Sequence, residues 1–190
     1  MEKKEFQKLF KDYMKSKGFK IKGNCGFKYI DGDYAIGVWL DHHPFTKGYF
    51  VEYGAVYYPN NKEHPLCTTG DWSSRFYFTS NSGDDLEQYG IGYLNKHFDR
   101  AKVVDWFEYD ELTEEDFLKQ MDINMEKRFA SVYDKEFVLN IYRSDWVKFR
   151  MIPYDTVRKI CSMIGLDAEE VILFRDGYTT KQGGTKFLKD

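Results

Sequence analysis

The feature that most constrains the fold is a run of alternating side chains between residues 34 and 41. Apolar residues occupy every second position of this run, as expected for a strand with one buried face. The residues of that face are Tyr34, Ile36, Val38 and Leu40, and the opposite face carries Ala35, Gly37, Trp39 and Asp41. Further strand-like runs cover residues 27–30, 49–58, 74–79 and 103–109. The turns between the first three runs are too short for parallel crossovers, so the pattern predicts an antiparallel meander.

Three helices are predicted around these strands. Residues 3–17 carry apolar side chains at helical spacing and are followed by Gly18, a typical helix stop. Thr113 begins a second helix, roughly 114–133, with acidic residues in its first turn. The last predicted helix runs from about Pro153 to Ile164 and ends at Gly165. The aromatic share of 18% favours a β-rich chain, because aromatic side chains pack well on pleated surfaces.

Together these patterns predict an α+β fold. We expect an antiparallel sheet of about five strands, with an N-terminal helix and C-terminal helices packed on it. A single domain over residues 1–175 and a loose, glycine-containing tail over 176–190 are expected. Two segments stay open: residues 85–99 allow a helix weakened by glycines, and residues 137–151 allow a strand pair or a broken helix.

Charge and cysteine content exclude several classes of protein. The net charge of −3 and the pI of about 5.9 provide no basic face for nucleic acid. We expect neither a signal peptide nor a membrane span, since no apolar run has the required length. Cys25, Cys67 and Cys161 are odd in number and widely spaced, which favours a reducing cytoplasm over a disulfide framework or zinc knuckle.

The N-terminal region resembles a known bacterial family. An amphipathic helix is followed by GFKIKGNCGFKYIDGDYAIGVWL and then by GYFVEYGAVYY, and later by RFYF and VVDWFEY ahead of a capped helix. This arrangement resembles the bacterial domain-of-unknown-function 4304 family over about residues 3–135. The sequence departs from the family pattern at Leu40-Asp41-His42-His43. The resemblance implies an α+β fold and carries over no catalytic residues.

Asp41-His42-His43 is the first candidate site. Metal-dependent phosphoesterases use such a triplet, and Asp41 and His43 would share one face of the strand whereas His42 would point to the other. Two ligands alone make a weak metal site. The alternative is that the histidines mark a strand end, where Pro44 stops the ladder.

The second candidate is a binding surface on one face of the sheet. Alternation predicts that aromatic and charged side chains of three strands converge there. They are Trp39, Asp41, Glu52, Arg75 and Tyr77. Such a surface would suit a ligand or protein partner. The alternative is that the C-terminal helices cover this face, with Arg75 paired to Asp41 or Glu52.

No catalytic residues, metal or cofactor are predicted. The GxSxG, GxxxxGK[ST] and HExxH patterns are absent. We expect a non-enzymatic cytoplasmic module of the immunity or antitoxin kind, which binds another protein and neither nucleic acid nor membrane. The alternative function is a small metal-assisted phosphoester hydrolase that uses Asp41 and His43.

Overall fold

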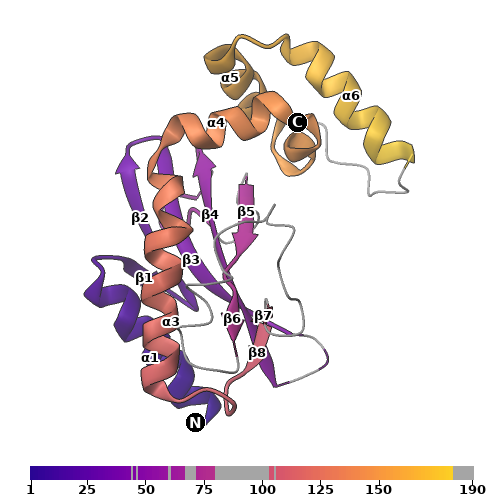
Figure 1. Ribbon diagram of the computed structural model, residues 1–190. Coiled ribbons are helices and arrows are strands. Elements are labelled where there is room, and N and C mark those ends of the chain that lie inside the picture. The colour runs from indigo at the N-terminus through magenta and orange to yellow at the C-terminus, as the bar shows by residue number, and fades with distance from the viewer. Residues whose placement is uncertain are drawn as a thin grey trace.

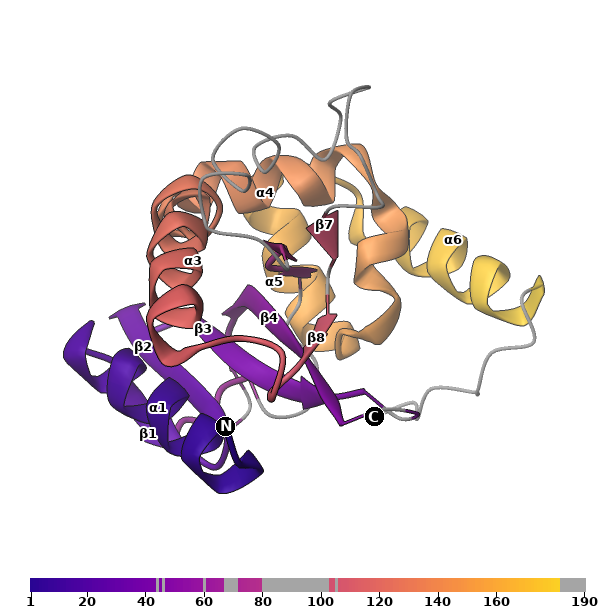
Figure 2. The same ribbon diagram turned by 60° about the horizontal axis from the view of Figure 1, so that its bottom comes forward.

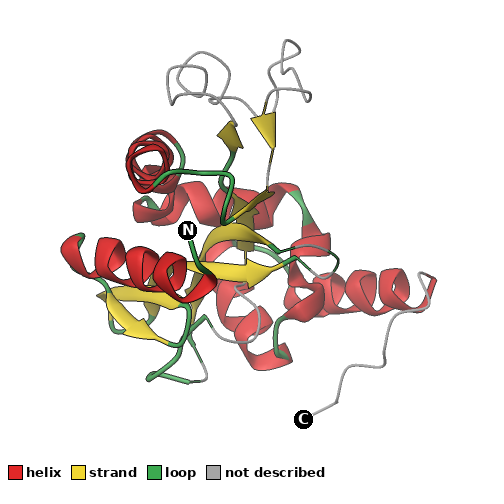
Figure 3. Cartoon of the chain, turned by 90° about the horizontal axis from the view of Figure 1, so that it is seen from below, coloured by secondary structure: helices red, strands yellow, loops and turns green. Residues whose placement is uncertain are grey.

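A computed structural model describes residues 1–43, 45, 47–59, 61–66, 72–79, 103, 104 and 106–181. Its strands are β1 (Lys20–Lys22), β2 (Cys25–Asp31), β3 (Tyr34–His42), β4 (Gly48–Tyr57), β5 (Trp72–Arg75), β6 (Phe78–Thr79), β7 (Val103–Val104) and β8 (Trp106–Glu108). Its helices are α1 (Lys3–Ser16), α3 (Glu114–Lys127), η1 (Phe129–Tyr133), α4 (Lys135–Ser144), η2 (Trp146–Met151), α5 (Tyr154–Ile164) and α6 (Ala168–Lys181). The α+β class is confirmed (Figures 1, 2 and 3).

The strands form an antiparallel sheet in the order β1-β2-β3-β4-β5, and β8 pairs with the first residues of β4 on the same edge as β5. The short turns predicted from the sequence explain the order from β2 to β4, because each of these strands folds back on the previous one. The predicted strand over residues 74–79 is interrupted. Its chain leaves the ladder after Arg75, and Asn124 of α3 bonds both the backbone N–H and the carbonyl of Tyr77 in place of a strand. Residues 85–99 lie outside the described residues.

One face of the sheet carries the main core. The predicted apolar positions of β3 are buried there with their β4 partners and with side chains of all the helices. Figure 1 shows α3 running across this face. Phe6 of α1 packs against the rings of Tyr49, Phe107 and Phe117, at centroid distances of 5.0 to 5.5 Å. These aromatic contacts join the first helix, the sheet and α3 in one hydrophobic core.

The two clearest predicted helices are present. Phe10 is fully buried, as its stripe position predicts, and the Thr113 hydroxyl accepts a hydrogen bond from the Asp116 amide as a cap. The second helix is shorter than expected, because α3 ends at Lys127 and η1 continues from Phe129. Met125 is only half-buried, so that end of the predicted stripe lies at the surface of the core.

The C-terminal region is more helical than the sequence patterns predict. The open segment 137–151 forms α4 and η2, and α5 ends at Gly165 with φ of +71° as expected. A further helix, α6, follows and continues to Lys181, so residues 176–181 of the predicted tail 176–190 are helical, and residues 182–190 lie outside the described residues. Arg175 of α6 is only 1% exposed and donates to the Ile152 carbonyl at 2.6 Å. This bond ties α6 to the end of η2. Among the described residues, no helix is long and apolar enough to cross a membrane.

The other face of the sheet carries a smaller cluster. Its buried members are Cys25, Phe27, Ala35, Val56 and Leu66, with Tyr29 and Trp39 packed against them. Within the described ranges this cluster contains no helical residue, because the helices bury their apolar side chains on the opposite face of the sheet, which carries Tyr34. Leu66, from the segment after β4, lies directly on Gly37. The structure therefore does not support the alternative in which C-terminal helices cover Trp39.

Candidate functional site

Three of the predicted surface residues meet on neighbouring strands. The register places Trp39 of β3 opposite Glu52 of β4, and Glu52 opposite Arg75 of β5. The Trp39 indole N–H donates to Glu52 Oε2 at 3.0 Å, and Arg75 Nε donates to Glu52 Oε1 at 3.1 Å. Both carboxylate oxygens are thus used, and the indole and the guanidinium are held in fixed positions. Of the two partners that the sequence left open for Arg75, the structure has Glu52.

This row continues toward the turn between β3 and β4. The Arg75 guanidinium lies 3.7 Å from the centroid of the Phe50 ring. The ring of His43 lies 5.2 Å from Phe50 and 6.1 Å from Phe45, and Phe45 is 90% exposed. Sequence reasoning missed Phe45 and Phe50, and it considered His43 as a metal ligand beside Asp41. Strand alternation alone would have put Phe50 on the same face as Glu52, two positions away.

We name this surface the Trp39 face and define it as Trp39, Asp41, Phe50, Glu52 and Arg75. Asp41 is exposed and lies opposite Phe50 in the register. The fifth predicted residue, Tyr77, is placed differently. Its backbone bonds Asn124, and the Arg128 guanidinium lies 4.3 Å from its ring centroid. Tyr77 therefore contacts the C-terminal end of α3, whereas Trp39, Glu52 and Arg75 contact one another.

The Asp41-His42-His43 triplet follows the alternation expected for a strand end. The His42 ring packs edge-to-face against Tyr49, whose side chain is in the main core, whereas His43 packs on Phe50. The two imidazoles are thus on opposite sides of the hairpin. His43 Nδ1 accepts a hydrogen bond from the Phe45 amide, at 3.3 Å. In the part of the chain that the structure describes, no three His, Cys, Asp or Glu side chains gather around a possible metal position.

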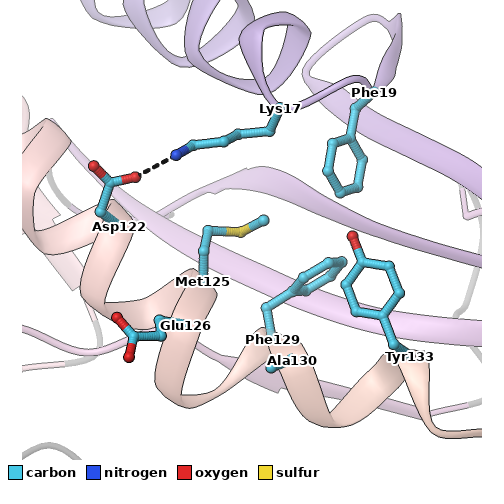
Figure 4. Close-up of a pocket in the computed structure, with 8 residues that line it drawn as sticks. All are labelled: Lys17, Phe19, Asp122, Met125, Glu126, Phe129, Ala130 and Tyr133. Atoms are coloured by element: carbon cyan, nitrogen blue, oxygen red, sulfur yellow. Dashed lines mark ion pairs between the residues drawn. The ribbon is translucent and has the colours of Figure 1, made fainter.

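A second concave feature lies between the segment that follows α1 and the helices α3 and η1, and we name it the α1–α3 groove (Figure 4). It has a volume of about 440 Å³. Its lining residues are Lys17, Phe19, Asp122, Met125, Glu126, Phe129, Ala130 and Tyr133. Figure 4 shows the apolar side chains in the middle and the Lys17–Asp122 ion pair at one end. Sequence reasoning missed this groove because its two sides are about a hundred residues apart along the chain.

The ion pair at the end of the groove has a third member. Asp122 Oδ1 accepts from the Lys17 ammonium at 2.7 Å and from the Tyr13 hydroxyl at 2.8 Å. Burial favours the neutral carboxyl, but these two hydrogen bonds outweigh it and hold the pKa of Asp122 below its ordinary value. Burial first, and then the bond to Asp122, raise the pKa of the Tyr13 hydroxyl. Tyr13 therefore stays a neutral donor throughout the physiological range.

Comparisons with protein-family models, with curated proteins and with solved structures found no match for this chain. The resemblance to the domain-of-unknown-function 4304 family stays a prediction.

Proposed function

We propose that this protein is a non-enzymatic module that binds another protein through the Trp39 face. The observation that carries the proposal is the row of Trp39, Glu52, Arg75 and Phe50, in which each side chain is positioned by the next. Tryptophan and arginine contribute a disproportionate share of the energy of protein interfaces. Side chains that are already ordered lose less conformational entropy on binding than free ones do.

Charge supports a basic partner. The Glu52 carboxylate is balanced by Arg75, whereas Asp41 is exposed at the edge of the face. The whole chain has a net charge of −3. An acidic surface speeds encounter with a basic partner, and the gain is greatest at low salt. We therefore propose a small acidic protein of the immunity or antitoxin kind, which binds a basic protein.

We also place this function in the bacterial cytoplasm. Cys161 is a buried free thiol, which suits a compartment that keeps thiols reduced. The bacterial origin is a proposal that rests on the family resemblance.

The test is affinity measurement on the partner captured from the native host. Trp39→Ala and Arg75→Glu are each expected to weaken binding at least about ten-fold, since truncating an interface anchor costs over about 1 kcal/mol. Arg158→Glu is the matched control, because Arg158 forms a comparable ion pair with Glu169 far away on α5 and α6. The double variant Glu52→Arg with Arg75→Glu keeps an ion pair within the face but reverses its polarity. A loss of binding by a folded double variant therefore separates lost binding from lost folding.

A captured partner that binds all four variants as tightly as the parent would show that another surface makes the contact. Stoichiometric divalent metal in the purified protein, lost on replacing Asp41 and His43 by alanine, would instead support the hydrolase.

A further inference from the structure

The two carboxylates of the Trp39 face differ in how they are used. Both Glu52 oxygens accept hydrogen bonds, one from the Trp39 indole and one from Arg75. The Asp41 side chain is exposed, and among the described residues its carboxylate accepts no hydrogen bond and joins no ion pair. Because Arg75 balances Glu52, the negative charge of the Trp39 face is concentrated at Asp41.

Aromatic rings lie on three sides of the Asp41 carboxylate. Trp39 and His43 are two positions before and after it in the chain, and strand alternation puts both on the same face. Phe50 lies opposite Asp41 in the register, and its ring is 5.2 Å from the His43 ring. On the fourth side, β2 pairs with β3 only as far as Trp39, so β2 does not extend alongside Asp41.

These surroundings suit a guanidinium better than an ammonium. A planar guanidinium donates two parallel hydrogen bonds to a carboxylate and lies flat on an aromatic ring, whereas an ammonium is a compact and strongly hydrated charge. The same face already contains one such arrangement, since Arg75 donates to Glu52 and lies 3.7 Å from the Phe50 centroid. Asp41 has a carboxylate and aromatic neighbours of the same kind, without a described cation beside them.

We propose that Asp41 binds an arginine side chain of the protein partner. This contact rests on the proposed function, and it names the residue type with which a basic partner reaches the Trp39 face. The guanidinium bonds the two Asp41 oxygens, and its flat side lies on the rings beside them. The rings limit the access of water to the ion pair once the partner is bound, so the contact is stronger than one in open water.

The experiment titrates the full chain with the Nα-acetyl amides of arginine, lysine and citrulline at neutral pH and low salt. Citrulline has nearly the shape of arginine and no charge. Amide ¹H–¹⁵N spectra and the Trp39 indole signal report both the position and the affinity of binding, and shift changes are expected at Trp39, Asp41 and His43. The arginine amide is expected to bind about three- to five-fold more tightly than the citrulline amide, the size expected of an exposed ion pair, with lysine between them.

A pair of variants tests the role of the carboxylate. Asp41→Asn is expected to remove the preference for arginine over citrulline. Glu170→Gln is the matched control, since Glu170 is an exposed carboxylate of α6, and it is expected to keep the preference. Equal binding of the arginine and citrulline amides to the parent would overturn the proposal. Tighter binding of lysine than of arginine, or a preference for arginine that survives in Asp41→Asn, would overturn it as well.

The captured partner separates this contact from the proposed function. Asp41→Asn is expected to weaken partner binding about three- to five-fold at low salt, and by less at high salt, because salt screens an exposed pair. If Trp39→Ala weakens binding and Asp41→Asn does not, the Trp39 face is the interface and the arginine contact is wrong. If neither variant weakens binding, the proposed function itself is wrong.

Discussion

Gly37 is closely packed against a neighbouring strand and Leu66, and replacing it by alanine tests how the smaller cluster is built. A Cβ at this position would lie 2.5 Å from the Gly26 carbonyl oxygen and 3.2 Å from Phe27 Cα, and it would also collide with the Leu66 Cδ1 methyl. A side chain such as Leu66 is able to move. The Gly26 oxygen is backbone within the β2–β3 ladder, so relief there requires a shift of the strand itself.

The magnitude follows from two opposed effects. Alanine restricts the unfolded chain more than glycine does, which favours the folded variant by about 0.4–1 kcal/mol. Forcing an extra methyl into a packed site costs about 1–3 kcal/mol and more when the backbone has to move. We therefore expect Gly37→Ala to lower the free energy of unfolding by about 2 kcal/mol. In a chain of this length that corresponds to roughly 4–8 °C in melting temperature.

Urea unfolding followed by far-ultraviolet circular dichroism measures this difference. Gly32→Ala is the matched control, because nothing lies within 4 Å of a Cβ at Gly32, and it is expected to stay within about 0.5 kcal/mol of the parent. The double variant Gly37→Ala with Leu66→Ala separates the two collisions, since only the one with Leu66 is removed. If Gly37→Ala is as stable as Gly32→Ala, the close approach of the strand and Leu66 to Gly37 is wrong.

Two further predictions concern the helices. Phe10→Ala is expected to lower the free energy of unfolding by about 3–5 kcal/mol, because Phe10 is fully buried. Met125→Ala is expected to lower it distinctly less, because Met125 is half-buried. Equal melting temperatures of the two variants would contradict this order. The depressed pKa of Asp122 contributes stability that is present above the carboxyl's unfolded pKa and is lost as the pH falls through its folded pKa. Asp122→Asn is therefore expected to flatten the acid limb of the stability profile, measured as urea midpoints between about pH 2 and 6, and an unchanged acid limb would show that the bonds from Lys17 and Tyr13 have no such effect.

The sequence alone was sufficient where a local period sets the structure. The alternation from Tyr34 to Leu40 and the short turns predicted an antiparallel meander, because a strand with one buried face needs that period. The stripe of α1 and the Thr113 cap predicted their helices for the same reason, since each depends on residues within a few positions. The common face of Trp39, Glu52 and Arg75 was also predicted by alternation and strand order, whereas the bonds that Glu52 accepts from Trp39 and Arg75 come from the structure.

Tertiary contacts decided the rest. Within residues 137–151, Val138, Leu139 and Tyr142 of α4 are buried at helical spacing, so this part carried a local signal that sequence reasoning missed. The short helix η2 depends on packing, as in the buried ring of Phe149 against Tyr142. Val171 and Ile172 of α6 are buried, whereas Leu173 beside them is 74% exposed. The apolar residues therefore do not form one stripe, and the sequence pattern did not predict this helix. Its Arg175 is buried against distant segments, where it donates to the carbonyls of Phe149 and Ile152 and lies over the ring of Tyr154.

The positions of the two candidate sites show the same division. Tyr77 left the predicted face because Asn124, 47 residues away, binds its backbone. The α1–α3 groove joins Lys17 to Asp122 across more than a hundred residues, and the Lys28 ammonium reaches its rings from β2. A period in the sequence states which face of an element is buried. Which element lies against that face, and which charges meet there, depends on contacts between segments that share no local pattern.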